Sequence, residues 1–171
     1  MKKSLNDMIT EILNDYKKEQ SAEIDEDTSG KIDVFVEAEP VYVVMGAPVA
    51  WARARTNNGR YYDSQAEIKE WFGWEIKRQM LQVLGISWPH TEPLHLSITF
   101  FMPIPRSYSK KKQAALEGHY HAKKPDCSNL IKFLEDALLG VLFKDDCIIA
   151  SISAKKVYDV NPRTEFTLTR L

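Results

Sequence analysis

The chain has few cysteines and no long apolar run, and these two absences exclude several classes of protein. Its 171 residues include two cysteines, Cys127 and Cys147, which are too few for a disulfide framework. No apolar run approaches the roughly 20 residues that a helix needs to span a membrane. Acidic residues interrupt the N-terminal segment, which therefore lacks the apolar core of a signal peptide. We expect a cytoplasmic protein with no membrane partner.

The net charge is close to zero, but the acids and bases are unevenly distributed. The whole chain has a formal charge of −1. Residues 1–40 contain five lysines against eleven acids, whereas residues 41–171 contain eighteen lysines and arginines against thirteen acids. A basic body is typical of a domain that binds a polyanion. The acidic front end either competes for the same surface or is a solvated linker.

The charge and the hydrophobic pattern divide the chain into an N-terminal extension over 1–40 and a domain over 41–171. In the extension, one apolar stripe has helical spacing: Leu5, Met8, Ile9, Ile12, Leu13 and Tyr16. The acidic, polar stretch that follows is typical of a flexible linker. A helix packed on its own domain and a helix that binds a partner both fit this pattern.

The remaining pattern predicts an α+β domain, with one small mixed or antiparallel sheet and helices packed on one of its faces. We expect strands within 41–50, 94–102, 147–157 and 163–171, the last two joined through 158–162. Helices are expected over 65–84, 108–118 and 128–141. Ser64 and Glu67 form a predicted capping box for the first helix. Its predicted apolar face is Ile68, Trp71, Phe72, Ile76, Met80, Val83 and Leu84.

Carboxylates lie close to both ends of the predicted helix 128–141. Asp126 precedes its first turn, and the pair Asp145–Asp146 follows it, just before a strand. Each alone is typical of a helix cap or a turn. If the helix and strand bring them to one sheet edge, a divalent cation such as Mg²⁺ would relieve their repulsion. Lys132, one turn into the helix, would then contact a phosphate held by that ion.

The segment "KPDCSNLIKFLEDALLGVLFKDD" resembles the signature of the RusA family of Holliday-junction resolvases, endodeoxyribonucleases often carried by phages and prophages. Upstream, "GAPVAWARARTNNGRYYDSQAEIKEW" is similar to the family's first strand, basic loop and following helix. Downstream, "KKVYDVNPRTEFTL" is similar to its closing hairpin. The resemblance covers residues 41–171.

The resemblance implies a RusA-like fold and a Mg²⁺-dependent enzyme, with Mn²⁺ as a substitute, that resolves four-way DNA junctions as a homodimer. It implies catalytic roles for Asp126, Asp146 and Lys132, and metal binding by Asp126, Asp146, Asp145 and Ser128. Ser128 departs from the pattern, because many members have an aspartate there. Either Asp136 or Asp145 takes the place of the missing acid, or metal affinity and turnover fall.

Two groups of basic residues flank the predicted site. Arg53, Arg55 and Arg60 lie in one loop with Tyr61 and Tyr62, which suits phosphates and unpaired bases. A second group leads directly to Asp126: Arg106, Lys110, Lys111, Lys112, Lys123 and Lys124. Either group alone is typical of a solvated loop. Together, beside a carboxylate site, they favour binding to branched DNA.

Three alternative functions remain open at this point. The first is a catalytically weak protein that binds junctions, which the serine at position 128 favours. The second is a nuclease that cuts flaps or single strands. The third is a small zinc protein that uses His119, His121, Cys127 and Cys147, although an acid beside each cysteine favours a harder ion.

Overall fold

The computed structural model describes residues 40–81 and 89–171, and these residues form an α+β domain, as predicted. Its elements are β1 (Tyr42–Met45), β2 (Arg55–Asn57), β3 (Arg60–Tyr62), α2 (Ala66–Met80), β4 (Leu94–Pro103), α3 (Lys110–Leu116), α4 (Cys127–Leu138), a short 3₁₀ helix (Asp146–Ile148), β5 (Ile149–Asp159) and β6 (Arg163–Arg170). The helix and linker predicted within 1–40 lie outside the described residues, as does the predicted helix end at 82–84. The short hairpin β2–β3 was not predicted; it was interpreted as a loop.

The main sheet is mixed and has the strand order β1-β6-β4-β5. β4 pairs with β5 in parallel and with β6 antiparallel, and β6 also pairs antiparallel with β1. β5 and β6 are consecutive in the chain but do not pair, so the predicted closing hairpin is wrong. The two strands are separated by β4, whose Ile98 lies opposite Ala154 of β5 on one side and Phe166 of β6 on the other. The apolar strand β4 occupies the centre of the sheet, and the more polar β5 lies at its edge.

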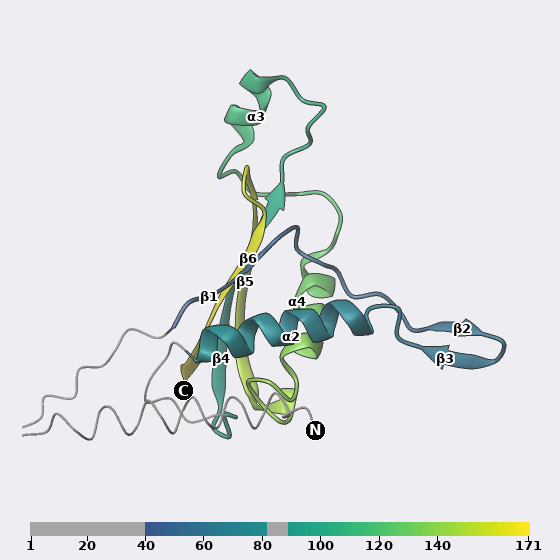
Figure 1. The fold of residues 1–171 in the computed structure, drawn as a ribbon. Helices are drawn as coiled ribbons and strands as arrows, with labels where there is room; N and C mark the ends of the chain where they lie inside the picture. The colour runs from purple at the N-terminus through teal and green to yellow at the C-terminus, as the bar shows by residue number, and fades with distance from the viewer. Residues whose placement is uncertain (1–39, 82–88) are drawn as a thin grey trace, which may run out of the picture. The chain divides into compact units, whose positions relative to one another are not determined.

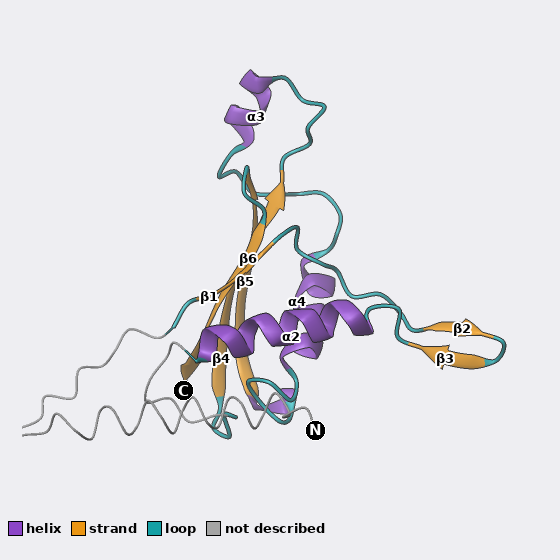
Figure 2. Cartoon of the chain, in the orientation of Figure 1, coloured by secondary structure: helices purple, strands orange, loops and turns teal. Residues whose placement is uncertain are grey.

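Helices α2 and α4 cover one face of this sheet (Figure 1). The alternate residues of β4 that were predicted to face the core are all buried: Leu94, Leu96, Ile98, Phe100 and Met102. Helix α3 buries no residue and stands beyond the end of β4 (Figure 2), so the predicted one-sided packing holds for α2 and α4 alone. No helix in the described part of the chain has the length and apolar content needed to cross a bilayer.

Helix α2 differs from its prediction at its start and on its buried face. Its N-cap is Gln65 and no side chain caps it, so the predicted Ser64–Glu67 capping box is wrong. Ile68 and Trp71 are exposed rather than buried, whereas Phe72 and Ile76 are buried as predicted. The cause is a close approach of Gly73 to α4 and to the turn after it, where an added Cβ would lie 3.4 Å from the carbonyl oxygen of Ala137 and 3.1 Å from Cγ2 of Val141. This contact turns the Trp71 side of the helix outward.

Helix α4 begins one residue earlier and ends three residues earlier than predicted. Its C-cap is Leu139, and Gly140 follows with φ +73°, the left-handed conformation that commonly ends a helix. Val141 therefore lies in the turn after the helix. The predicted apolar stripe is otherwise confirmed: Leu130, Phe133, Leu134, Ala137 and Leu138 are buried, and Ile131 is half-buried.

Candidate active site

Asp126 occupies the N-cap position of α4, with φ −72° and ψ 147°. Its backbone carbonyl accepts a hydrogen bond from the amide of Leu130 at 3.2 Å, so the chain enters the helix at this residue. The side chain accepts no capping hydrogen bond, although N-cap aspartates commonly do. The exposed carboxylate is therefore left available to a ligand at the positive end of the helix dipole.

Lys156 of β5 holds the segment that precedes Asp126. This lysine was not among the predicted site residues. Its Nζ donates to the carbonyl oxygens of Lys123 (2.8 Å) and Pro125 (2.6 Å). Its own carbonyl accepts from the amide of His121 at 2.9 Å. Lys156 shares the helix-covered face of the sheet with Phe100, its partner on β4. A lysine at an inward position of an alternating strand was the signal that could have revealed it.

The histidines near this segment have structural surroundings. His121 is buried with its ring centroid 4.6 Å from that of Tyr158, and the Tyr158 amide donates to the carbonyl of His119. Burial, and then the ammonium of Lys156, lower the pKa of His121. Within residues 40–81 and 89–171, no three His, Cys, Asp or Glu side chains are placed to hold a metal ion. The zinc alternative gains no support from these residues.

Lys132 lies in the second turn of α4, on the same helix as Asp126. It is exposed, and its Nζ is 5.3 Å from the ring centroid of Trp51. The amide of Trp51 donates to the carbonyl of Asn129 at 2.8 Å, which fixes the segment after β1 against the start of α4. The predicted catalytic lysine thus has an aromatic support, and its ammonium forms no ion pair within the described residues.

The acidic pair after α4 interacts with a third acid that sequence reasoning missed, Glu135. Asp145 caps the 3₁₀ helix: its Oδ1 accepts from the amide of Cys147 at 2.9 Å, which lowers the pKa of Asp145. The pKa of Glu135 is raised, first by burial and then by the charge of Asp146, while Lys132 opposes the rise. Asp146 and Lys132 therefore both lie near Glu135. Because Glu135 follows Lys132 by three residues on a helix, the spacing could have identified it.

The predicted metal ligands come from both sides of α4. Asp126 is the N-cap of α4, and Asp146 begins the 3₁₀ helix that follows it in the chain. Asp126 and Asp146 form no ion pair with another described residue. The acids of the described residues also form no group of three that could hold a metal ion. Carboxylate oxygens are nevertheless the ligands that Mg²⁺ prefers, and it often takes one or two of them and keeps water and phosphate as its other ligands. Ser128, in the first turn, is exposed.

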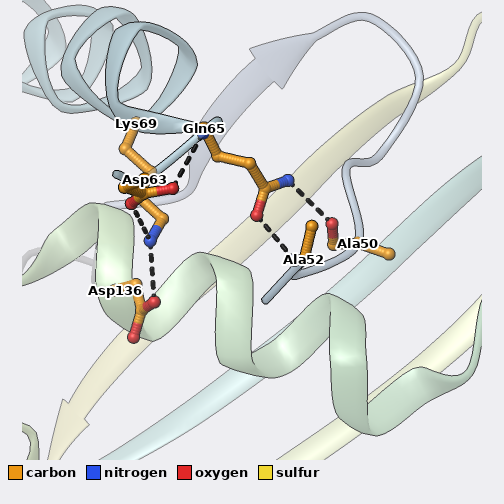
Figure 3. Close-up of polar contacts among 6 residues, drawn as sticks. All are labelled: Ala50, Ala52, Asp63, Gln65, Lys69 and Asp136. Carbon is orange, nitrogen blue, oxygen red and sulfur yellow. Dashed lines mark hydrogen bonds and ion pairs between the residues drawn. The ribbon is translucent and has the colours of Figure 1, made fainter. Parts of the chain in front are cut away.

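The two acids suggested as replacements for an aspartate at position 128 are both engaged elsewhere. Figure 3 shows Asp136 beside Lys69 of α2, whose Nζ lies 2.8 Å from Oδ2 of Asp136 and 2.9 Å from Oδ2 of Asp63. Asp145 caps the 3₁₀ helix through Cys147. Neither carboxylate is free in the way that Asp126 is.

The second group of basic residues is organised around Tyr108. Nζ of Lys112 lies 3.9 Å from the Tyr108 ring centroid, and Nζ of Lys123 lies 3.1 Å from the Tyr108 hydroxyl. The hydrogen bond from Lys123, and then the nearby lysine charges, lower the pKa of Tyr108. A lysine of α3 thus meets, at Tyr108, a lysine of the segment that leads to Asp126. Arg106, Lys110, Lys111 and Lys124 are exposed around them.

Comparison with known proteins agrees with these features. The family model of endodeoxyribonuclease RusA matches residues 46–169. The chain belongs to the RusA family. The family is one of endodeoxyribonucleases, so the resemblance found in the segment from Lys124 to Asp146 is confirmed.

Two relatives illustrate the range of the family. The chain is 30% identical over 133 residues to uncharacterized protein YqaN of Bacillus subtilis (strain 168), covering 72% of this chain and 91% of that protein. It is 35% identical over 80 residues to crossover junction endodeoxyribonuclease rusA of Lactococcus phage r1t. That match covers 46% of this chain and 56% of the phage protein.

Proposed function

We propose that this RusA-family endodeoxyribonuclease resolves four-way DNA junctions by paired, symmetric nicks, with Mg²⁺ held by Asp126 and Asp146. The observation that carries the proposal is the Asp126 carboxylate, which is exposed at a helix start and accepts no capping hydrogen bond. Lys112 and Lys123 meet at Tyr108, and Lys123 belongs to the segment that leads to Asp126. The junction-cleaving activity named for the phage relative supports the same substrate.

Different residues of this chain have different roles around the scissile phosphate. When bound, a divalent cation supplies Lewis-acid activation of water and of the phosphate. Lys132 places an ammonium beside that phosphate and stabilises the charge that develops in the transition state. Lys156 keeps the chain before Asp126 in place through two carbonyl oxygens. Lys112 and Lys123 bind the DNA backbone on the side of α3.

The substrate favours a homodimer. A four-way junction presents two equivalent strands that must be cut in a matched way, and a two-fold symmetric enzyme offers one site to each. Ser128 contributes a neutral hydroxyl where an additional acid is the alternative, so the metal site has one negative charge fewer. We therefore expect a working enzyme with a modest affinity for Mg²⁺.

The proposal is tested by cleavage of a synthetic four-way junction with Mg²⁺, with Mn²⁺ and without metal. Asp126→Asn and Asp146→Asn should each reduce cleavage at least about a hundredfold, because a charged ligand is lost, while junction binding stays within a few-fold. Glu92→Gln, which removes an exposed acid paired with Arg170, is the control. Parallel loss of binding and cleavage, or normal cutting, would contradict the metal assignment.

A second candidate, a catalytically weak junction-binding protein, rests on Ser128. If the site lacks a ligand there, Ser128→Asp should increase cleavage at low Mg²⁺, because it adds a charged oxygen beside Asp126. If the wild-type site is complete, another carboxylate adds repulsion and raises the Mg²⁺ requirement. Cleavage against Mg²⁺ concentration for both proteins decides between the two, and a curve shifted to higher Mg²⁺ favours the complete site.

A further inference from the structure

The β2–β3 hairpin presents different side chains on its two faces. Arg55 lies opposite Tyr62, and Thr56 lies opposite Tyr61. Residues opposite one another in an antiparallel pair share a face, and neighbours along a strand alternate between faces. One face therefore has Arg55, Arg60 and Tyr62, and the other has Thr56 and Tyr61. The first face is cationic and the second has no charge.

Folding of the domain does not explain these side chains. Tyr61 is 81% exposed and Tyr62 is 46% exposed, and both arginines are exposed. In the described part of the chain, neither arginine forms an ion pair. Figure 1 shows the hairpin extending from the start of α2, away from the sheet. Two arginines without acidic partners suit a polyanion, whereas an open tyrosine ring suits an aromatic surface.

The base of the hairpin is fixed by polar contacts. On the incoming side, the Gln65 side chain accepts from the amide of Ala52 at 2.7 Å and donates to the carbonyl of Ala50 at 2.9 Å. On the outgoing side, Asp63 pairs with Lys69, which also pairs with Asp136 of α4 (Figure 3). Both ends are thereby fixed to helices, and α4 is the helix that begins at Asp126. The direction of the hairpin relative to the candidate site is set by these contacts.

We propose that this hairpin is a two-sided DNA arm that recognises the branch point of the substrate. Arg55 and Arg60 bind backbone phosphates, and Tyr61, on the opposite face, stacks on a base that is unpaired or unstacked at the branch. Base–aromatic stacking is tolerant of sequence, because every base has a π face. This role of the hairpin rests on the proposed function. It specifies the feature of branched DNA that the chain contacts, which is the branch point.

The test compares Tyr61→Ala, Tyr61→Phe and Tyr62→Ala on a junction with 2-aminopurine at the branch point and on a matched duplex. Tyr61→Ala should weaken junction binding about tenfold and abolish the fluorescence change, with duplex binding unaltered. Tyr61→Phe keeps the ring and should behave like wild type. Tyr62→Ala, on the cationic face, should leave the fluorescence change intact.

Arg55→Ala provides the complementary measurement. It should weaken binding to junction and duplex alike and lower the slope of log affinity against log salt by about one. Wild-type junction selectivity and fluorescence in Tyr61→Ala would overturn the stacking role, as would equal losses on junction and duplex. Wild-type protein that binds and perturbs the branch point but cuts no junction with Mg²⁺ or Mn²⁺ would overturn the proposed function and leave the arm standing.

Discussion

Helix α4 and the β2–β3 hairpin both carry predicted functional residues, but they are held in opposite ways. α4 buries Leu130, Phe133, Leu134, Ala137 and Leu138 against the sheet and α2. Each buried leucine or phenylalanine among them contributes about 2 kcal/mol by burial alone. None of the hairpin residues whose burial is described is buried, and the hairpin depends on hydrogen bonds and ion pairs at its base. The position of α4, with its proposed catalytic residues, is therefore set by the core, whereas the position of the hairpin, the proposed DNA arm, is set by a few polar contacts near the surface.

The largest effect should come from the core beneath α4. Phe133→Ala removes a fully buried ring that meets Phe72 edge-on at 5.9 Å, and should lower the free energy of unfolding by about 3–4 kcal/mol. Tyr61→Ala on the hairpin should change it by less than about 0.5 kcal/mol. Urea denaturation of both variants measures the contrast. Similar losses would show that the hairpin is part of the folding core.

Lys156→Met tests whether the start of α4 also needs a polar tether. Losing the bonds to the carbonyls of Lys123 and Pro125 should misplace Asp126 and lower kcat roughly tenfold to a hundredfold, because small displacements of reacting groups are costly. Junction affinity should stay within a few-fold, and Lys156→Arg should recover part of the rate.

The matched control for Lys156→Met is Lys155→Met. Lys155 precedes Lys156 on β5 and is exposed on the opposite face of the sheet. It removes the same charge without touching the segment before Asp126. Equal losses of kcat in the two variants would show that general positive charge, rather than the tether, supports cleavage.

Lys69→Met sharpens the comparison at the base of the hairpin. It leaves Asp136 unpaired at a half-buried position and Asp63 unpaired at an exposed one, and should cost about 1 kcal/mol of unfolding free energy. Junction selectivity should fall with it, because the direction of the arm is lost. Arg78→Met, which breaks the pair of an exposed arginine with Glu75 on the same helix, should cost less stability and keep selectivity. Retained selectivity in both variants would contradict the anchoring role.

The smallest effect concerns Glu135 on α4. Burial and Asp146 raise the pKa of Glu135 above its usual 4.5, so the folded state holds this proton more tightly than the unfolded state. Its ionisation therefore destabilises the fold as pH rises above 4.5. Glu135→Gln should raise the Tm at pH 7, and the gain should shrink as the pH falls toward 4.5. Glu117→Gln, an exposed acid at the end of α3, is the control, and a gain independent of pH would contradict the electrostatic cause.

The parts of the fold that were predictable are those whose signal is local. In β4, the buried apolar residues Leu94 to Met102 recur at every second position, and in α4 the apolar residues recur at helical spacing. Both elements were therefore predicted close to their observed bounds. The position of β4 between β5 and β6 was not predictable, because pairing partners are set by long-range packing. The exposure of Trp71 depends on the contact of Gly73 with α4, which no local pattern shows.

The residues of the candidate site also divide into those that a local sequence pattern reveals and those that it does not. Asp126, Lys132 and the Asp145–Asp146 pair came from one contiguous segment, and their roles stay predictions. Lys156 and Lys69 act on backbone or acids far away in the sequence, at separations that periodicity cannot reveal. Short, arginine-rich strands such as β2 and β3 lack the apolar alternation by which strands are recognised.

The parallel pairing of β4 with β5 has a consequence for the lifetime of the site. The crossover between these strands, residues 104–148, contains α3, α4 and every predicted catalytic group. Its far end is joined to the edge strand β5, in which Tyr158 is the one buried residue, and segments with few buried apolar contacts open more readily in native-state fluctuations. Each opening of β5 would release Lys156 and loosen the start of α4 while the rest of the sheet stays closed. Amide hydrogen exchange in β5 is thus expected to report how often the enzyme is competent to cut.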